Sequence, residues 1–302
     1  MRSENKLLSF SVVTAVLTAL IFPVLVNAQV LHEERSVYRD ITVAQNGNRR
    51  CLVFNVLRGD RNQTCLDMND KDRLGFTYTK MSFAGLLLTP SPKNILVAGL
   101  GGGTIPMAMN ELFPDATIDI VEIDQAVVNV AKDYFFFEEN EKMKVSINDA
   151  RVFVKRAGIL GKKYDYIILD AFGGDYIPEH LLTQEFLEEV KLIMSPDAVL
   201  VANTFSTSRF YDHESVTYQQ VFNEFFNFKL PSSGNRIIMT QLGPLPPRGT
   251  LASAAQQIAP SLEKYGVPLL EYPNKLSTRV DWDMSRRVLT DQYAPANLLR
   301  EN

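Results

Sequence analysis

The chain has few of the side chains that usually build metal centres. Its 302 residues include only three histidines and two cysteines. The histidines, His32, His180 and His213, lie far apart in the sequence, and no metal-ligand spacing appears among them. We therefore expect no bound metal.

The sequence also lacks an excess of positive charge. Lysine and arginine number 31 against 35 acidic residues, which gives a net charge of −4. No basic stripe marks a nucleic-acid surface, so we expect no nucleic-acid partner. Neither a Gly-x-Ser-x-Gly elbow nor a paired Cys/His arrangement suggests a hydrolase. Internal repeats and low-complexity tracts are absent as well.

One long hydrophobic run is present, at the N-terminus. Residues 7–26 are almost uncharged and follow Arg2 and Lys6, and Val26-Asn27-Ala28 resembles a small-residue cleavage site. The pattern predicts a secretory signal with Gln29 as the mature start. The run is long for a signal, and at roughly 20 residues it would also span a bilayer as an uncleaved anchor. Either alternative predicts a domain outside the cytoplasm, which is periplasmic, secreted or membrane-anchored.

The two cysteines, Cys51 and Cys65, suit an oxidising compartment. They flank a polar turn at residues 58–62 between two strand-like runs, so a hairpin would bring them together. We expect a disulfide, which at this loop size stabilises a fold by about 3 kcal/mol. The alternative is two unpaired thiols on opposite faces of the hairpin.

Apolar residues make up 46% of the chain, which is enough for a real hydrophobic core. We expect residues 29–90 to form a small β-rich domain with strands at 36–44, 50–57 and 63–68 and a hairpin turn at Asn46-Gly47. A helix is expected over 78–88, and Pro90-Ser91-Pro92 marks a boundary.

From residue 91 to 302 the pattern is one of strands alternating with helices. Continuous apolar strands are expected at 95–98, 143–147, 164–169, 198–205 and 236–242, and another is expected to end near Glu122. Helices are expected at 124–134, 183–194, 215–226 and 251–265, with Asp124 as an N-cap. This alternation predicts an α/β fold with a Rossmann-like parallel sheet covered on both faces.

Glycines and acids follow the strands of this sheet. Gly99, Gly101, Gly102 and Gly103 come after the first strand, and Glu122 follows about 20 residues later. Asp149 and Asp170 follow the next strands. Since the carboxyl ends of parallel strands share one edge, the pattern predicts a nucleotide site there.

Each feature has a simpler alternative. The glycines could form a turn chosen for packing, and Glu122 could be an exposed strand-end acid. Asp149 could cap the following helix, a role compatible with ligand binding. Asp170 could be a turn-forming residue. Thr104 stands where a strict dinucleotide motif has its last glycine, which disfavours a nicotinamide dehydrogenase.

Several motifs resemble the spermidine synthase (polyamine aminopropyltransferase) family over almost everything after Ser36. The matching segments are 37–41 ("YQDI"), Gln63-Thr64, Tyr78 ("YHEM"), 99–104 ("GGGDGG"), 121–124 ("VEID"), 148–149 and 164–170. Residues 177–183 and 290–295 are closer to a divergent synthase-like branch that often carries membrane segments.

The resemblance implies S-adenosylmethionine or its decarboxylated form as a co-substrate, not as a tightly bound cofactor. It implies that the glycines and Gln63 contact this nucleotide, that Glu122 binds the ribose and that Asp149 binds the adenine amine. Asp170 and Tyr78 would be catalytic, with Asp170 accepting a hydrogen bond from an amine acceptor. The family also implies a homodimer formed through the N-terminal β region.

The departures concern the amine half of the site. Gly102 replaces the acid of the family's glycine loop, Arg39 replaces the Gln of its opening strand, and Lys80 lies in the segment that replaces "HE". Gly173 stands where the family has a second Asp, and Asp175 is shifted. If Arg39 and Lys80 faced the pocket, they would repel a polyamine.

Three functions remain open at this point. The first is aminopropyl transfer to an amine, the second is methyl transfer from S-adenosylmethionine, and the third is a secreted, non-catalytic binding protein. The signal sequence favours the third, because sulfonium nucleotides are made in the cytosol. We expect a spermidine-synthase-like transferase of the polyamine biosynthesis type.

Overall fold

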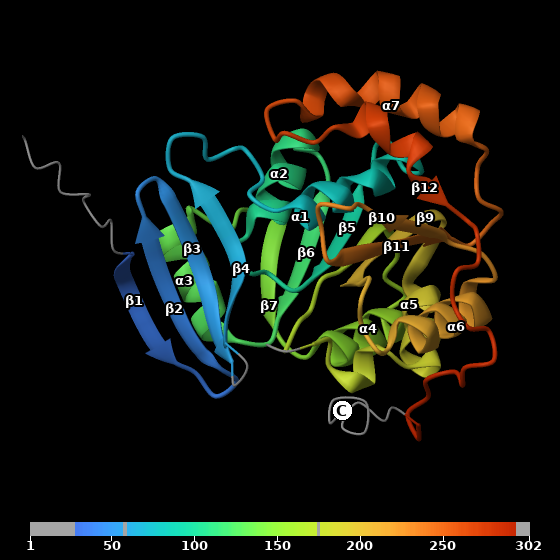
Figure 1. The fold of residues 1–302 in the computed structure, drawn as a ribbon, viewed down its shortest axis with the longest axis horizontal. Helices are drawn as coiled ribbons and strands as arrows, with labels where there is room; N and C mark the ends of the chain where they lie inside the picture. The colour runs from blue at the N-terminus through green and yellow to red at the C-terminus, as the bar shows by residue number, and fades with distance from the viewer. Residues whose placement is uncertain (1–27, 57–58, 174–175, 294–302) are drawn as a thin grey trace, which may run out of the picture.

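The computed structural model describes residues 28–56, 59–173 and 176–293 and places their strands in two sheets (Figure 1). The N-terminal sheet is antiparallel in the order β1-β2-β3-β4. Its strands are β1 (Gln29–Arg35), β2 (Asp40–Asn46), β3 (Arg49–Val56) and β4 (Gly59–Asp67). The prediction missed β1 and began β4 too late, at residue 63.

Two local features of this sheet confirm predictions. Gly47 takes a φ of +57° in the tight turn between β2 and β3, a conformation that glycine adopts without strain. Cys51 lies directly opposite Cys65 in the β3–β4 register, and the two form a disulfide. The disulfide therefore links the two strands at one edge of this sheet.

The second sheet has the order β12-β10-β11-β9-β8-β5-β6-β7. Its parallel strands are β5 (Asn94–Ala98), β6 (Thr117–Glu122), β7 (Met143–Ile147), β8 (Tyr164–Leu169) and β9 (Met194–Phe205). The predicted α/β Rossmann-like class is confirmed. The sheet is mixed, however. The strand expected at 236–242 is present as β11 (Asn235–Gln241), but it runs antiparallel to β9, and β10 (Phe226–Lys229) and β12 (Leu276–Ser277), which were not predicted, extend this antiparallel edge.

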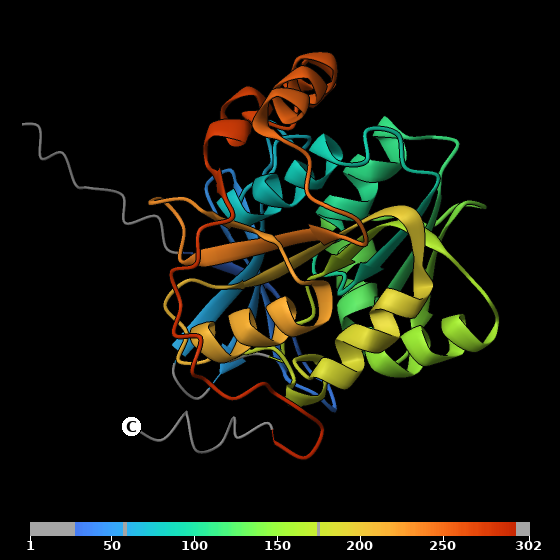
Figure 2. The same ribbon diagram turned by 90° about the vertical axis from the view of Figure 1, so that its right-hand side faces the viewer.

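Helices cover both faces of this sheet (Figures 1 and 2). One face carries α1 (Thr77–Ser82), the 3₁₀ helix η1 (Phe83–Leu87), α2 (Thr104–Leu112), α7 (Arg248–Leu262) and η3 (Leu269–Asn274). The other carries α4 (Ala150–Ile159), η2 (Glu179–Leu181), α5 (Gln184–Ile193) and α6 (Tyr211–Phe222). Each group of helices buries a separate apolar core against the strands, as expected for strands that are apolar on both sides.

The helix α3 (Gln125–Phe135) joins the two sheets. Val128 and Ala131 pack into the core of the large sheet, whereas Val127 and Val130 pack against the N-terminal sheet. An apolar face on each side of one helix explains why the two sheets form a single packed body. Its predicted cap is confirmed, since the Asp124 carboxylate accepts a hydrogen bond from the backbone N–H of Ala126 at 3.1 Å.

Other predicted helices differ at their ends. The helix expected over 78–88 is divided into α1 and η1, and α7 begins at Arg248, before the predicted start. The helix expected over 215–226 begins at Tyr211 and ends at Phe222, because Asn223 takes a φ of +66° and the chain turns into β10. Consecutive apolar residues at this junction fit either a helix or a strand, so their pattern alone did not separate the two.

The predicted signal or anchor, residues 7–26, lies outside the described residues. Among the ranges that the structure does describe, no helix is long and apolar enough to cross a membrane.

Candidate functional site

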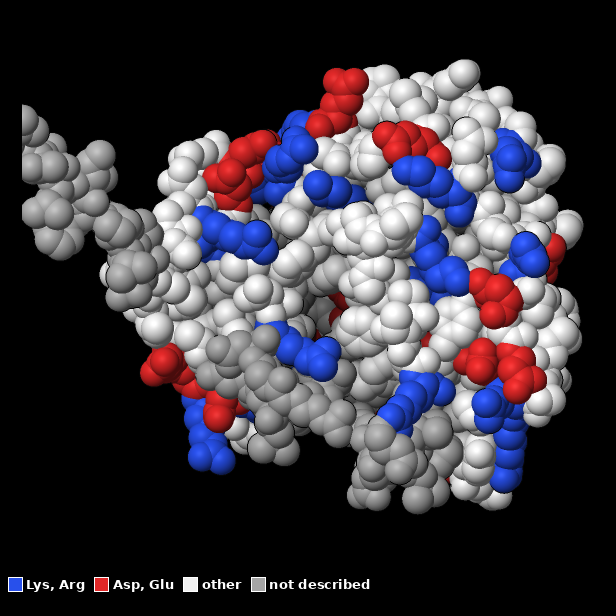
Figure 3. Space-filling model, in the orientation of Figure 1, with Lys and Arg blue, Asp and Glu red and all other residues white. Residues whose placement is uncertain are grey.

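A cavity of ≈ 260 Å³ lies at the carboxyl ends of β5, β6 and β8, where the N-terminal sheet approaches them. Its walls include these predicted site residues: Gln63, Tyr78, Gly99, Gly101, Glu122, Asp149 and Asp170. On the face shown in Figure 3 the surface is hollowed near its middle, with acidic atoms visible inside the hollow and a basic side chain beside it. The structure thus brings most of the sequence-predicted site together around one cavity.

The glycine turn permits a close approach between two strand ends. Gly99 has a φ of +99°, and a Cβ added there would collide with the backbone carbonyl of Asp170. The adjacent N–H of Leu100 donates to the Glu122 carboxylate at 3.1 Å. The turn therefore packs against the backbone of Asp170 and holds the Glu122 carboxylate in place.

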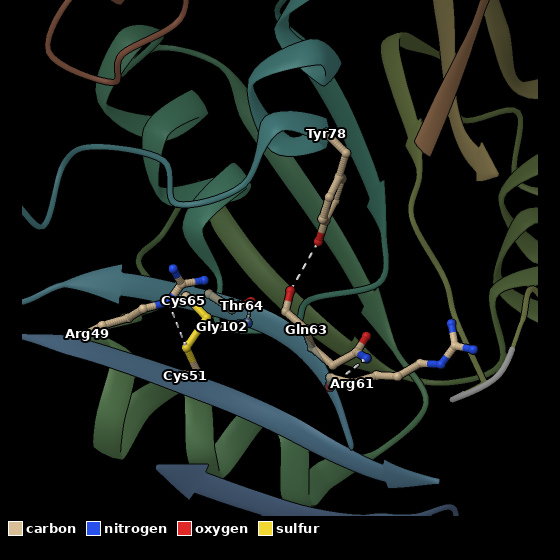
Figure 4. The surroundings of a disulfide bond; sticks show 8 residues. All are labelled: Arg49, Cys51, Arg61, Gln63, Thr64, Cys65, Tyr78 and Gly102. Atoms are coloured by element: carbon tan, nitrogen blue, oxygen red, sulfur yellow. Dashed lines mark hydrogen bonds between the residues drawn. A yellow bond between two sulfur atoms is a disulfide. The ribbon is translucent and has the colours of Figure 1, made fainter. Parts of the chain in front are cut away.

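Gly102 and Gly103 lie behind this cavity and are not among its lining residues. The N–H of Gly102 donates to the Thr64 hydroxyl at 2.8 Å, and a Cβ at position 102 would lie 2.7 Å from the Thr64 methyl group (Figure 4). Gly103, at a φ of +77°, is the N-cap of α2 and packs against Phe137. Thr64 therefore occupies the space that a side chain at position 102 would need, which explains the missing loop acid physically.

Glu122 is buried, with 7% of its surface exposed, and both carboxylate oxygens are fixed by backbone donors. Leu100 N–H donates to one oxygen and Asp124 N–H to the other, at 3.1 and 3.0 Å. Burial raises the pKa of Glu122, and these hydrogen bonds and the Arg39 guanidinium oppose the rise. Each oxygen keeps a further lone pair for a ligand hydroxyl.

Asp149 caps a helix, the simpler alternative, and its second oxygen lies at the cavity. One of its oxygens caps α4 by accepting hydrogen bonds from the N–H groups of Arg151 and Val152, at 2.9 and 3.1 Å. The other lies 2.8 Å from His180 Nε2 at the cavity wall. Burial raises the pKa of Asp149, but the bonds from Val152 and His180 outweigh burial and lower it overall. The carboxylate is therefore ionised and already paired on its cavity side.

Asp170 follows β8 and lines the same cavity. Burial raises the pKa of its carboxyl to about 7, the nearby Glu122 charge adds to the rise, and a hydrogen bond from Asn203 opposes it. Asn203 Nδ2 donates to Asp170 Oδ1 at 2.8 Å. A carboxyl group with such a pKa can exchange a proton near neutral pH.

Tyr78 and Gln63 form the side of the cavity that faces α1. The Tyr78 hydroxyl donates to the backbone carbonyl of Gln63 at 3.1 Å, which ties α1 to β4 (Figure 4). Burial, and next the charge of Asp170, raise the pKa of Tyr78 well above its usual value. Tyr78 is therefore a neutral hydroxyl close to the Asp170 carboxyl group.

The two basic residues that distinguish this chain from the family motifs behave differently. Arg39 lines the cavity, stacks on Phe54 at 4.4 Å and donates to the Phe172 carbonyl at 3.1 Å. It also pairs with Asp124 at 3.6 Å. Lys80 is not among the lining residues of this cavity. Only one of the two cations therefore meets the condition for repelling a polyamine.

A second cavity of ≈ 250 Å³ adjoins the first. Both cavities are lined by Gln63, Tyr78 and Phe172. The additional walls of the second are Arg61, Asn62, Asn203, Phe205 and Asn235. Asp170 lies at the junction, since it lines the first cavity and bonds to Asn203 in the second. The arrangement can hold two molecules whose reacting atoms meet beside one carboxyl group.

Sequence reasoning missed three polar residues of this site. His180 was given no site role beyond its place in the motif at 177–183. Asn203 fell inside the strand expected at 198–205, and Asn235 lay just before the one expected at 236–242. An asparagine at the end of an otherwise apolar strand was the available signal for Asn203, because buried polar groups need partners. No group of three or more potential metal ligands occurs among the described residues.

Comparisons with known proteins agree with this geometry. The model of the spermine/spermidine synthase domain family matches residues 76–232. A polyamine aminopropyltransferase of Vibrio vulnificus is 48% identical over 289 residues, which cover 95% of this chain and 97% of that protein.

Solved structures show the same fold. A probable spermidine synthase of Corynebacterium glutamicum superposes with a TM-score of 0.64 at 19% identity, covering 85% of this chain and 98% of that one. Human methyltransferase-like protein 13, in complex with SAH, has a TM-score of 0.58 at 26% identity, covering 74% and 100%. From the family match and the near full-length relative, the chain belongs to the spermidine synthase (polyamine aminopropyltransferase) family.

Proposed function

We propose that this chain transfers an aminopropyl group from decarboxylated S-adenosylmethionine to an amine acceptor of the polyamine class. The observation that carries the proposal is the position of Asp170 at the junction of two adjoining cavities. The 48% identity to an aminopropyltransferase over nearly the full length supports the same activity.

In this proposal the first cavity holds the nucleotide. Two backbone N–H groups position Glu122 to accept hydrogen bonds from the ribose hydroxyls. Asp149 would accept a hydrogen bond from the adenine amino group, through the oxygen that pairs with His180 in this structure. Gln63 and Tyr78 form the wall between the nucleotide and the second cavity, which would hold the acceptor.

The reaction is a displacement at a carbon activated by the sulfonium. The acceptor nitrogen forms a bond to that carbon, the carbon–sulfur bond breaks, and its electron pair stays on sulfur as a neutral thioether. Because an alkylammonium acceptor has a pKa of about 10, one proton must leave before attack. Asp170, with a pKa of about 7, accepts the amine hydrogen bond and this proton. Alignment across the junction supplies much of the remaining rate.

Methyl transfer from S-adenosylmethionine is a second candidate, favoured by one feature of the first cavity. Arg39 lines it with a buried Nε that forms an ion pair with Asp124 at 3.6 Å but no hydrogen bond among the described residues, and position 102 lacks the acid of the family's loop. An arginine is a good partner for the carboxylate that decarboxylation removes. The similarity to the methyltransferase solved with SAH points the same way.

Calorimetry with the two nucleotides separates the candidates. We expect the protein without residues 1–28 to bind decarboxylated S-adenosylmethionine more tightly than S-adenosylmethionine. The reverse order would favour methyl transfer, and no binding of either would contradict both. Arg39→Gln is the matched variant: it should weaken S-adenosylmethionine binding selectively only if Arg39 pairs with the carboxylate.

We also propose that the domain lies outside the cytoplasm, cleaved or anchored through residues 7–26, and acts as a homodimer. The disulfide supports an oxidising compartment. Sequencing the N-terminus of protein from fractionated cells tests the location, with Gln29 expected after cleavage and Met1 for an anchor. A purely cytosolic protein would contradict this location.

Light scattering of the purified domain tests the proposed homodimer, and a monomeric mass would contradict it.

A further inference from the structure

A row of hydrogen bonds leads from the antiparallel edge of the sheet to the catalytic carboxyl group. Ser233 Oγ donates to Asn235 Oδ1 at 3.3 Å, and Asn235 Nδ2 donates to Asn203 Oδ1 at 3.0 Å. Asn203 Nδ2 then donates to Asp170 Oδ1 at 2.8 Å. The row therefore ends on the group that would take the acceptor's proton.

The strand register explains why these side chains meet. Asn203 of β9 lies opposite Ile237 of β11, and Asn235 lies opposite Phe205, so the two asparagines are diagonal neighbours. Diagonal residues on one face of an antiparallel pair are within reach of each other's side chains. Both line the second cavity, and Asn203 is only 2% exposed.

The partners of Asn203 determine which way its amide points. Asn235 donates to its oxygen, which leaves the Nδ2 side to face Asp170. With the amide turned round, two N–H₂ groups would face each other and an oxygen would face the Asp170 carboxylate. The Ser233 hydroxyl bonds to the Asn235 oxygen on the far side of that amide.

We propose that Asn203 is a positioning residue for the transfer reaction, and that Asn235 orients it. Asn203 holds Asp170 through Oδ1, so that Oδ2 remains for the acceptor amine. Within the described residues no other side chain donates to Asp170, so Asn203 alone fixes its orientation from the sheet. The inference rests on the aminopropyl transfer proposed above.

The other ionisable groups close to Asp170 are Glu122 and Tyr78. The Glu122 charge raises the pKa of Asp170, and the hydrogen bond from Asn203 is the interaction that lowers it. Removing that bond leaves burial and Glu122 unopposed. The protonated, inactive form of Asp170 would then persist to higher pH.

The test is the pH dependence of aminopropyl transfer by Asn203→Ala and Asn235→Ala. For Asn203→Ala we expect the acidic limb of kcat to move up by about one pH unit and kcat at pH 7 to fall roughly 5-fold. The KM for the nucleotide should change little, because Asn203 does not line the nucleotide cavity. Asn235→Ala should shift the limb in the same direction by less.

Asn227→Ala is the matched control. Asn227 is a 4% exposed asparagine of the same sheet that bonds to Tyr211 and Asp281, away from both cavities. It should lower the melting temperature without moving the limb. If Asn203→Ala does not fold, the shift expected for Asn235→Ala still tests the proposal. If wild type is active and the acidic limbs of both variants superimpose on its own, this inference alone is overturned. If wild type transfers no aminopropyl group, the proposed function is overturned as well.

Discussion

The proposed nucleotide half of the site and the proposed acceptor half are built in different ways. In the nucleotide half, Glu122 and Asp149 are charged groups held by backbone N–H donors at strand and helix ends. In the acceptor half, Asn203 and Asn235 are neutral amides held by other side chains on antiparallel strands. Asp170 lies between the two and takes its properties from both.

The difference explains which half keeps the family's motifs. Backbone donors remain in place whatever the neighbouring side chains are, so the nucleotide half requires only the turn geometry and one acid per strand. The acceptor half depends on side chains from β4, β9 and β11, and any of them can change separately. The motifs at residues 99–104, 121–124 and 148–149, which match the family, accordingly contribute to the walls of the first cavity.

The largest expected effect is at the point where the halves meet. Asp170→Asn should lower kcat by about 10²–10⁴-fold, because the amine loses its proton acceptor. The hydrogen bond from Asn203 is kept, since the new side chain still offers an oxygen. Calorimetry should show nucleotide affinity within a few-fold of wild type. Retained turnover would show that the two halves do not share this residue.

The same variant should alter stability in a pH-dependent way. The pKa of Asp170 is 3.8 unfolded and about 7 folded, so the stability due to the protonated carboxyl is complete below about pH 4 and lost as the pH rises through 7. At pH 8, Asp170→Asn should therefore have a higher free energy of unfolding than wild type, by up to about 4 kcal/mol. Its melting temperature should be higher as well. The difference should vanish at pH 4. Equal melting temperatures at pH 8 would contradict the raised pKa.

A change confined to the nucleotide half should weaken binding more than turnover. In Glu122→Gln, an N–H₂ group replaces one oxygen, so either Leu100 or Asp124 loses its acceptor. We expect nucleotide affinity to fall roughly 10- to 100-fold, the usual cost of a charged hydrogen bond. Glu139→Gln is the control, because Glu139 also accepts a backbone N–H, from Val145, outside the cavity. Equal effects of the two variants on affinity would contradict the assignment.

The smallest effect is expected at His180. In His180→Ala the cavity-side oxygen of Asp149 is free, so an adenine amino group no longer has to replace a hydrogen bond. Nucleotide affinity should rise a few-fold, consistent with about 1 kcal/mol for one net hydrogen bond. His32→Ala, on β1, should leave it unchanged. A clear loss of affinity in His180→Ala would mean that His180 itself binds the nucleotide.

The parts of the fold that sequence predicted well have local causes. Asp124 caps α3 and Thr183 caps α5 through their own side chains, and the parallel strands are continuous apolar runs. The parts that were missed have distant causes. The sequence of β10 is as apolar as the end of α6, so it could be taken for a continuation of that helix. It is a strand because it pairs with β11.

The same contrast holds for the site. The meeting of Glu122, Asp149 and Asp170 at one cavity was predictable because each lies at or just after the carboxyl end of a parallel strand. Asn203 and Asn235 were not, since nothing in the sequence shows that β9 and β11 are antiparallel neighbours. Gly102 was expected to contact the nucleotide, and its contact with Thr64 required knowing how β4 lies against the glycine turn.

The most direct test of the account is product analysis by mass spectrometry. The purified domain would be incubated with decarboxylated S-adenosylmethionine and a diamine, and compared with Asp170→Asn in parallel. We predict that wild type forms the diamine extended by one aminopropyl group together with an equal amount of the thioether nucleoside, and that the variant forms neither. Nucleotide binding without either product from the wild type would contradict aminopropyl transfer by this site.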